Sequence, residues 1–469
     1  MRSVSFQELI TATGGEDRGL ISPSDCFDRV VLDSRMVEPG DLFWAVAGER
    51  YDGHQFVAQA LAAGAVGSVV DEHHVDQTAG PRVVVDDTLL ALWDFSESYR
   101  NHTDALVIGV TGSVGKTTTR RMISSVLSAK FTGTESPRNY NNQFGVPLSL
   151  LEIDPADEFA VIELGASRVG DIDELCGIAH PEVGVVTAIG PAHLEDFESF
   201  ENIVQAKSEL IAALPEHGFA VLNGDDKNVL RLAEIAPCPV ILVGEKKHND
   251  IIARNVSCDN NSISFEVDGS RFSIPAAGRH HLVSALCAIA IGRQIDMDDA
   301  EIATGMQTFK SVAGRTQLMN IGPWTVINDS YNSNPLSMSS ACKTLRDWKT
   351  DGKKILVTGD MLSLGEWSKN FHELIGSEAV QCRLDRIVAV GSQAGLVVGN
   401  AKKNGMDAGR LGVCSDHDLA LLHLDMWLEP GDVVLVKGSR DMHMERIVAG
   451  LEELAAAQQP AQQSQKQAA

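Results

Sequence analysis

The sequence lacks the patterns that mark a membrane protein, a secreted protein or a zinc domain. No stretch of its 469 residues approaches the ~20 continuous apolar residues that span a bilayer. The opening MRSVSFQELITATGG has no basic segment followed by an apolar run, so we expect no secretory signal. Eight cysteines are scattered without a Cys-x-x-Cys pair, which argues against a zinc ribbon or a disulfide framework. Together these absences favour a soluble protein of the reducing cytoplasm.

Basic residues are also scarce. The chain has 39 Lys and Arg against 64 Asp and Glu, for a formal net charge of −25. Such a charge repels nucleic-acid backbones and anionic lipid, so we expect no nucleic-acid partner and no membrane insertion. A polyphosphate ligand must therefore be held by local donors and metal ions. We expect a monomer.

Alternating apolar runs divide the chain into three α/β regions, as its length also suggests at ~150 residues per domain. Residues 1–100 have the rhythm of a small α/β domain. Residues 101–313 contain near-continuous apolar runs, ALVIGV, EFAVIEL, VGVVTAIG and FAVLNG, which predict a mostly parallel sheet of the P-loop type covered on both faces. Residues 314–455 predict a smaller, doubly wound domain. Residues 456–469, rich in Ala and Gln, predict a disordered tail.

A phosphate-binding loop follows the first strand of the central region. Strand ALVIGV runs into Thr111-Gly112-Ser113-Val114-Gly115-Lys116-Thr117-Thr118 and then into an amphipathic helical stretch. Glycines let backbone N–H groups converge on phosphate oxygens, Lys116 can bridge the terminal phosphates, and Thr117 can ligate Mg²⁺. The strict P-loop spacing is not met, because Val110 occupies the first glycine position. A structural glycine turn is the alternative, but the order of strand, GKTT and helix favours ATP or GTP binding.

Three more side chains are candidates for the same site. Glu163 ends the strand FAVIEL, at the carboxyl edge of a parallel sheet, and suits a Mg²⁺ ligand. His193 follows the next strand and can take a second metal. Lys207 lies in the helical stretch FENIVQAKSELIAAL with acids on both sides. From the residues alone, a solvated loop acid, a structural histidine and a surface ion pair remain the alternatives.

An ordered series of short segments carries a family resemblance. The segments are TGSVGKTTT, PRNYNNQFGVPLSLL, VIELGA, IGPAHLEDF, QAKSELI, GRHHLVSAL, GRTQ and DSYNSNP. In this order they resemble the Mur ligase family, over essentially the whole chain from residue 30 to residue 448. The resemblance implies a domain for UDP-muramoyl peptide, a central ATPase-like domain, and a C-terminal domain that closes over the nucleotide. It also implies ATP and Mg²⁺ as cofactors.

Other segments narrow the resemblance. DSYNSNP, KILVTGDMLSLGE and VLVKGSRDMHMERIV resemble the member that joins D-alanyl-D-alanine to UDP-N-acetylmuramoyl-tripeptide in peptidoglycan synthesis. In the implied reaction, ATP phosphorylates the tripeptide carboxylate and the dipeptide amine attacks the acyl phosphate, giving ADP, phosphate and UDP-muramoyl pentapeptide. The alternatives are another Mur or folylpolyglutamate-type ligase, or a noncatalytic nucleotide-binding relative. A mechanical P-loop NTPase is poorly supported.

The resemblance also implies roles for residues of the central domain. Thr117 and Glu163 become ligands of one metal and His193 a ligand of another. Lys207 becomes a carbamylated lysine, whose carbamate orients metal. This role replaces the surface ion pair that the local sequence favours for Lys207, and it depends on the resemblance alone.

Residues of the C-terminal domain receive roles in the same way. Arg315 matches the arginine that reaches phosphate, and Asp329 matches the acid near the ribose and the reaction centre. A guanidinium can bind phosphate oxygens bidentately when the domains close. The adenine side is expected to be lined by Tyr331, Asn332 and Asn334. The dipeptide is expected to face Lys437, Gly438, Ser439 and Arg440.

The N-terminal domain matches the family pattern for the uridine nucleotide. The matching residues are Ser34, Arg35, Asp52, Gly53 and His54. A surface turn followed by a helix cap is their structural alternative.

The chain departs from the family at three positions. Val114, His281 and Ser284 stand where asparagine is usual, which puts the adenine contacts and base selectivity in doubt.

Overall fold

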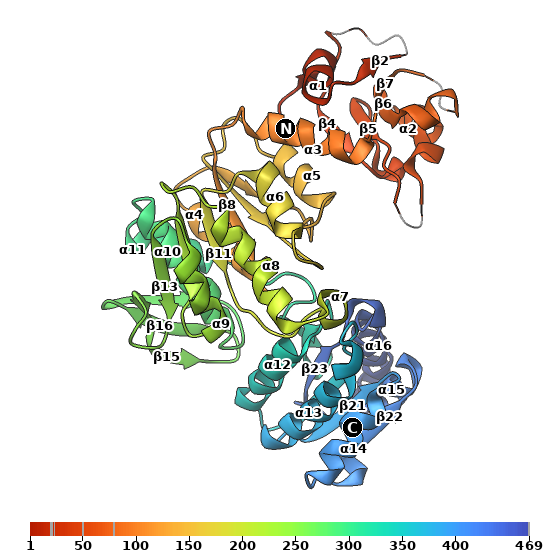
Figure 1. The fold of residues 1–469 in the computed structure, drawn as a ribbon. Coiled ribbons are helices and arrows are strands. Elements are labelled where there is room, and N and C mark those ends of the chain that lie inside the picture. Colours follow the sequence, from red (N-terminus) through yellow and green to blue (C-terminus); the bar gives the residue numbers. More distant parts are fainter. Residues whose placement is uncertain (19–21, 23, 49–50, 78–79, 468–469) are drawn as a thin grey trace.

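Three α/β regions follow one another along the molecule, from the N-terminal region at one end to the C-terminal region at the other (Figure 1). The computed structural model describes residues 1–18, 22, 24–48, 51–77 and 80–467. Within these residues, no helix is long and apolar enough to cross a membrane. The predicted α/β class with a central parallel sheet is confirmed, whereas the residue limits of the domains stay predictions.

The N-terminal region is built on a five-stranded sheet in the order β2-β7-β6-β5-β4. Only β2 runs antiparallel to its neighbour. The elements are β1 (Val4–Ser5), α1 (Phe6–Thr13), β2 (Glu16–Asp17), β3 (Cys26–Phe27), β4 (Arg29–Val31), β5 (Asp41–Trp44), α2 (Val57–Ala63), β6 (Gly67–Asp71), β7 (Arg82–Val85) and α3 (Thr88–Arg100). On α3, Phe95 stacks on Trp44 of β5 at 5.9 Å between ring centroids, which packs this helix on the sheet.

The central region holds a seven-stranded parallel sheet in the order β14-β13-β12-β11-β8-β10-β9. Its first half contains β8 (Leu106–Thr111), α4 (Lys116–Leu127), β9 (Gly133–Glu135), α5 (Gly145–Leu151), β10 (Phe159–Glu163), α6 (Asp171–Ala179), β11 (Val183–Val186), α7 (Leu194–Phe197) and α8 (Phe200–Ala212). Its second half contains β12 (Phe219–Asn223), α9 (Lys227–Leu230), β13 (Val240–Gly244), β14 (Ile251–Ile252), β15 (Arg254–Cys258), β16 (Ile263–Val267), β17 (Ser270–Ile274), α10 (His281–Gln294) and α11 (Asp299–Gln307).

Helices cover both faces of this parallel sheet, which explains its continuous apolar strands. On β8, Val107 belongs to the core shared with α5, α6 and α8, whereas Ile108 and Val110 belong to the core shared with α4 and α10. Strand β8 lies between β10 and β11, so the chain leaves all three strands at one edge of the sheet. That edge is where a parallel sheet binds its ligands.

The C-terminal region is a six-stranded sheet in the order β18-β19-β23-β20-β21-β22, with only β18 antiparallel. Helices α12 to α14 pack on one face and α15 and α16 on the other, so the doubly wound prediction is confirmed. The elements are β18 (Gln317–Ile321), β19 (Trp324–Asp329), α12 (Pro335–Asp347), β20 (Lys354–Gly359), α13 (Ser368–Gln381), β21 (Arg386–Val390), α14 (Ala394–Lys403), β22 (Leu411–Cys414), α15 (His417–Trp427), β23 (Val433–Lys437) and α16 (Glu445–Gln467).

The last helix, α16, runs as far as Gln467. The disordered tail from residue 456 stays a prediction. Residues 468 and 469 lie outside the described part of the chain.

Candidate active site

A cavity of about 570 Å³ lies where the central and C-terminal regions meet. The central region contributes Ser113–Thr118, Glu163 and His193. The C-terminal region contributes Arg315, Asp329, Tyr331, Asn332, Asn334, Lys437, Ser439 and Arg440. Thus most of the predicted ATP, metal and dipeptide residues line one space, although they are far apart in the sequence.

The phosphate loop is held in place by the end of β11. The backbone N–H of Ser113 donates to the carbonyl of Ala188 at 2.8 Å. Gly112 has φ +143°, and a Cβ there would come within 2.1 Å of Thr187 Oγ1, so glycine is required. Gly115, with φ +82°, is the N-cap of α4. Thr111 is buried and donates to the carbonyl of Leu164 at 2.8 Å, so it supports the loop from behind.

Lys116 is the first residue of α4, and its ammonium contacts the preceding loop. Its Nζ donates to the carbonyl of Gly112 at 2.8 Å. Burial lowers the pKa of Lys116, the Glu163 carboxylate opposes that shift, and the Arg315 cation adds to it. Two cations from different domains therefore face one another across the cavity, an arrangement that an anionic ligand would stabilise.

Glu163 is a fully buried carboxylate at the end of β10. It accepts hydrogen bonds from Thr117 Oγ1 at 2.8 Å and from Asn141 Nδ2 at 2.7 Å, and Arg120 Nη1 lies 3.7 Å from its Oε2. The carboxylate and the hydroxyl are hard oxygen donors at the phosphate end of the cavity, which fits Mg²⁺. Sequence reasoning assigned no role to Asn141, although it lies in the quoted segment PRNYNNQFGVPLSLL.

His193 and Lys207 both lie near the Lys116 cation. Partial burial and the Lys116 cation lower the pKa of His193, although 48% of its side chain is exposed and Asp196 opposes the shift. Lys207 is buried on α8, so the surface ion pair that its sequence suggests is wrong. Burial, and then the Lys116 cation, lower the pKa of Lys207 to about 7. Its ammonium lies 5.8 Å from the Phe197 ring and has no hydrogen bond or ion pair within the described residues.

On the C-terminal side, Asp329 is fixed by two donors. Lys437 Nζ donates to Asp329 Oδ2 at 2.7 Å, and the backbone N–H of Thr316 donates to Oδ1 at 3.0 Å. Lys437 is buried and also donates to the carbonyl of Asn332 at 2.8 Å. The ammonium of Lys437 therefore positions Asp329. Since it is held by these two hydrogen bonds, it has little freedom to contact a bound dipeptide. Sequence reasoning missed Thr316, which belongs to the quoted segment GRTQ.

Two arginines approach the ring of Tyr331. The guanidinium carbon of Arg315 lies 4.2 Å from the ring centroid, and that of Arg440 lies 5.6 Å from it. Arg440 is about half exposed and pairs with Glu445 at 3.2 Å, so it can exchange partners more easily than Lys437. Ser439 Oγ accepts the backbone N–H of Leu362 at 2.8 Å and shapes the adjacent loop.

The predicted uridine-nucleotide residues lie apart, in the N-terminal region. Ser34 is buried and donates to Gln59 Oε1 at 3.3 Å, whereas Arg35 is 80% exposed and pairs with Asp33. A Cβ on Gly53 would lie 2.7 Å from the backbone nitrogen of Val46, so glycine is needed for this close approach. Arg35 is thus the cation best placed to meet a diphosphate from solvent.

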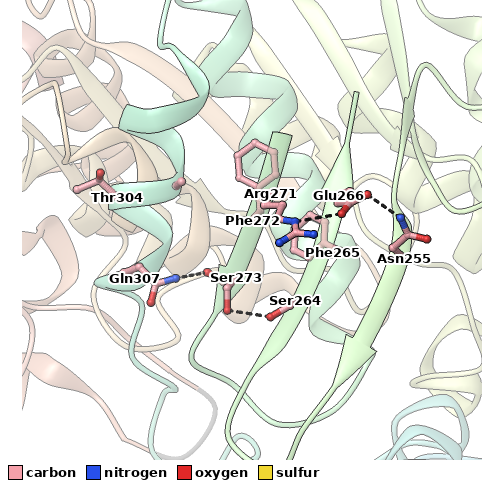
Figure 2. Close-up of a pocket in the computed structure, with 10 residues that line it drawn as sticks. Asn255, Ser264, Phe265, Glu266, Arg271, Phe272, Ser273, Thr304 and Gln307 are labelled. Atoms are coloured by element: carbon pink, nitrogen blue, oxygen red, sulfur yellow. Dashed lines mark hydrogen bonds and ion pairs between the residues drawn. The ribbon is translucent and has the colours of Figure 1, made fainter. Parts of the chain in front are cut away.

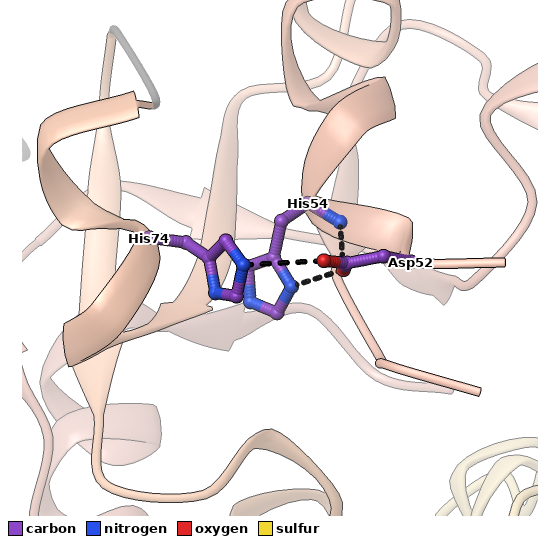
Figure 3. Close-up of side chains that lie close together, drawn as sticks. All are labelled: Asp52, His54 and His74. Carbon is purple, nitrogen blue, oxygen red and sulfur yellow. Dashed lines mark hydrogen bonds and ion pairs between the residues drawn. The ribbon is translucent and has the colours of Figure 1, made fainter. Parts of the chain in front are cut away.

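His54 belongs to a cluster with Asp52 and His74 (Figure 3). Its Nδ1 lies 2.7 Å from Asp52 Oδ1, and its Nε2 accepts the backbone N–H of Asp71 at 3.2 Å. Both nitrogens of His54 are therefore used inside the protein. The rings of His54 and His74 stack with centroids 4.1 Å apart and planes at 15°. Nearly parallel rings cannot both aim an in-plane lone pair at one ion, so we interpret the cluster as structural.

A larger hollow of about 760 Å³ lies on the antiparallel sheet β15–β16–β17, beside α11 (Figure 2). Its polar side chains bond to one another. Glu266 accepts from Asn255 at 2.6 Å and from Arg271 at 3.2 Å, and Gln307 donates to the carbonyl of Ser273 at 2.6 Å. These polar groups already have hydrogen-bond partners within the protein, so they do not indicate a ligand. None of the predicted site residues lines this hollow.

Comparison with known proteins agrees with the geometry of the cavity. Models of the Mur ligase family match residues 27–99 (catalytic domain), 110–292 (middle domain) and 314–440 (glutamate ligase domain). The UDP-N-acetylmuramoyl-tripeptide–D-alanyl-D-alanine ligase of Bacillus subtilis (strain 168) is 35% identical over 426 residues, which is 90% of this chain and 92% of that relative. The chain belongs to the Mur ligase family.

Solved structures of Mur ligases share the whole fold. A crystal structure of MurF from Acinetobacter baumannii matches this Mur ligase with a TM-score of 0.88 and 32% identity, over 97% of this chain and 99% of that one. MurF from Thermotoga maritima, solved in complex with ADP, matches with a TM-score of 0.78 and 29% identity, over 92% and 98% of the two chains. The resemblance inferred from the sequence is confirmed.

Proposed function

We propose that this Mur ligase adds D-alanyl-D-alanine to UDP-N-acetylmuramoyl-tripeptide, with ATP as the energy source. The observation that carries the proposal is the single cavity in which Lys116 and Glu163 of the central domain face Arg315 and Asp329 of the C-terminal domain. It is supported by full-length similarity to ligases that bear this substrate in their names, and by an ADP-bound structural neighbour. The product is UDP-muramoyl pentapeptide, with ADP and phosphate.

The cations of the cavity solve the main physical problem of this reaction, which is that a phosphate and a carboxylate repel each other. Lys116 exchanges the Gly112 carbonyl for phosphate oxygens, and Arg315 approaches them from the other domain. The γ-phosphoryl group moves to the tripeptide carboxylate, giving an acyl phosphate and ADP. The dipeptide amine then attacks the acyl carbon, a C–N bond forms, the C–O bond to phosphate breaks, and the amine loses a proton.

Two metal positions belong to this proposal. Thr117 and Glu163 would hold one Mg²⁺, and His193 with a carbamylated Lys207 would hold another. When bound, Mg²⁺ neutralises charge on the phosphate oxygens. Glu163 is prepared for this role because Thr117 and Asn141 already orient its two oxygens.

The environment of Lys207 supports its carbamylation. A buried amine with a pKa of about 7 is about half uncharged in neutral solution, and the uncharged form is nucleophilic. Attack of the neutral amine on carbon dioxide forms an N–C bond and releases one proton, so an uncharged group becomes an anion. That anion would lie near His193 and near Lys116, whose positive charge disfavours a protonated Lys207.

Lys207 gives a test of this chemistry. We expect Lys207→Ala to lower turnover roughly a hundredfold, as loss of a metal-orienting group typically does. We also expect the wild-type enzyme to lose activity in carbon-dioxide-free buffer and to regain it when bicarbonate is added, with no such response in the variant. Lys402→Ala, an exposed lysine on α14, is the matched control. Wild-type activity that ignores bicarbonate, with no added mass of carbon dioxide on the intact protein, would contradict the carbamate.

Two arginines are the proposed contacts of the anionic ends of the substrates. Arg35, exposed beside the buried Ser34, is the proposed contact of the uridine diphosphate, with Asp52, Gly53 and His54 shaping the neighbouring turn. Arg440 is the proposed contact of the dipeptide carboxylate. All eight cysteines are free, which supports the proposed reducing cytoplasm, where ATP is also available. A monomer remains our proposal for the assembly.

Mass spectrometry tests the function directly. The full chain is incubated with ATP, Mg²⁺, D-alanyl-D-alanine and UDP-muramoyl tripeptide that ends in either diaminopimelate or lysine. We expect pentapeptide from at least one tripeptide, with one ADP released per product. ATP binding without any amide product would favour a noncatalytic relative, and product only from a folate substrate would favour a folylpolyglutamate-type ligase.

A further inference from the structure

Arg120 is a buried cation of α4 that the proposed reaction leaves without a task. It lies four residues beyond Lys116, on the same face of the helix. Its Nη1 lies 3.7 Å from Oε2 of Glu163, the carboxylate proposed to hold Mg²⁺. A buried charge is costly unless an opposite charge lies nearby, so Glu163 depends on a neighbouring cation before any ligand binds.

The hydrogen bonds of Arg120 go to other acceptors and fix its position. Its Nε donates to Oε2 of Glu135, at the end of β9, at 3.2 Å. Its Nη1 donates to the carbonyl of Arg138, in the following loop, at 2.8 Å. The 3.7 Å that separate Nη1 from Glu163 are too long for a hydrogen bond. Arg120 therefore supplies positive charge to Glu163 without occupying the lone pairs that a metal would use.

The charges around Glu163 do not favour a free divalent cation. Burial lowers the pKa of Lys116 and the Glu163 carboxylate opposes that shift, which places Lys116 within its electrostatic reach. Glu135 is shared between Arg120 and Arg121. Three basic side chains thus accompany two carboxylates at this end of α4, which leaves no excess of negative charge. The phosphates of a nucleotide would supply that excess.

We propose that Arg120 is a positioning residue that substitutes for the divalent cation at Glu163 until a nucleotide binds. Before binding, its charge stabilises the carboxylate and opposes the uptake of free Mg²⁺. When phosphates enter the cavity, their negative charge reverses the balance, and Mg²⁺ binds together with them. The inference rests on the proposed function, because it requires Glu163 to be a metal ligand.

A purely structural role for Arg120 predicts the opposite effect on metal binding. If Arg120 only fastened α4 to the loop at Arg138, its loss would loosen Glu163 and weaken the binding of a metal. If its charge opposes the metal, its loss strengthens that binding. The sign of the change in metal affinity therefore separates the two roles.

Binding of Mn²⁺ to the full chain without nucleotide tests this inference. Mn²⁺ takes the same oxygen ligands as Mg²⁺, and the paramagnetic resonance signal of unbound Mn²⁺ reports the free concentration. We expect Arg120→Met to lower the Kd of the site at Glu163 at least about tenfold, because a unit charge close to the carboxylate is removed. Arg120→Lys keeps the charge and should bind Mn²⁺ as the wild type does. Arg254→Met, at an exposed arginine of β15, should leave the Kd unchanged.

A double variant assigns the effect to Glu163. Arg120→Met combined with Glu163→Gln should lose the gain in affinity, because the carboxylate that binds the ion is gone. Binding at the second proposed metal position, at His193 and Lys207, does not depend on Glu163 and remains as a common background in all variants.

The outcomes separate this inference from the proposed function. An unchanged or higher Kd in Arg120→Met, or an equal fall in Arg254→Met or in the double variant, overturns the role of Arg120 while the ligase proposal stands. If Arg120→Met does not fold, Glu135→Gln decides the matter. It removes a negative charge beside Arg120, so the Kd should rise, and an unchanged or lower Kd overturns the inference.

A further result would overturn both proposals at once. If Glu163→Gln binds Mn²⁺ with a nonhydrolysable ATP analogue, and forms pentapeptide, as well as the wild type does, then Glu163 is no metal ligand. The metal site of the proposed function and the role of Arg120 would then fall together.

Discussion

Lys116→Ala is expected to lower turnover at least about a thousandfold, the typical cost of removing a charge that stabilises a transferring phosphoryl group. Lys116 is the only cationic residue of the phosphate loop, Thr111 to Thr118. Its ammonium donates to the carbonyl of Gly112, next to the position where phosphate oxygens would lie. Arg315 approaches from the other domain and cannot replace a charge fixed at the first turn of α4.

The fold should tolerate this change, and that separates a catalytic role from a structural one. Within the described residues Lys116 makes a single hydrogen bond, worth about 1 kcal/mol, and its removal costs the attraction to Glu163 but relieves the burial of a charge and the repulsion with Arg315. Thermal unfolding should therefore move by a few degrees at most, while ADP release falls below detection. Lys247→Ala, at an exposed lysine, is the control. More than a tenth of wild-type activity in Lys116→Ala would refute the assigned role.

Glu163→Gln is expected to cost about a thousandfold in kcat/KM and to raise the Mg²⁺ concentration needed for half-maximal activity. An amide cannot supply the negative charge that a hard divalent cation requires. It also brings N–H donors against the donors Thr117 and Asn141, which should lower the free energy of unfolding by about 1–3 kcal/mol. A Mg²⁺ titration of pentapeptide formation, beside a thermal melt, measures both effects.

Two further variants make the Glu163 result specific. Glu163→Asp keeps the charge but shortens the side chain, so it should keep more activity than the glutamine variant. Glu158 lies just before β10, is exposed and, within the described residues, its side chain accepts only the backbone N–H of Thr132. Glu158→Gln should therefore change neither activity nor Mg²⁺ dependence. An unchanged Mg²⁺ requirement in Glu163→Gln would remove Glu163 from the metal site.

Much of the fold and of the phosphate site could be predicted from the sequence because local patterns determine them. Apolar runs such as ALVIGV specify buried parallel strands, and GKTT between a strand and an amphipathic helix specifies a phosphate loop. The antiparallel sheet β15–β17 was not predicted, because its strands alternate polar and apolar residues over only a few positions.

By itself, then, the sequence determined the order of the domains, the loop from Thr111 to Thr118 and, through ordered motifs, the family. Only the tertiary structure decided which side chains meet. It brought Arg315 into the same cavity as Lys116 and paired Lys437 with Asp329. It also buried Lys207, whose ammonium has no hydrogen bond or ion pair within the described residues. The reason is physical: a residue type fixes which bonds a side chain can make, but burial and the neighbours supplied by distant segments decide which of those bonds are already made.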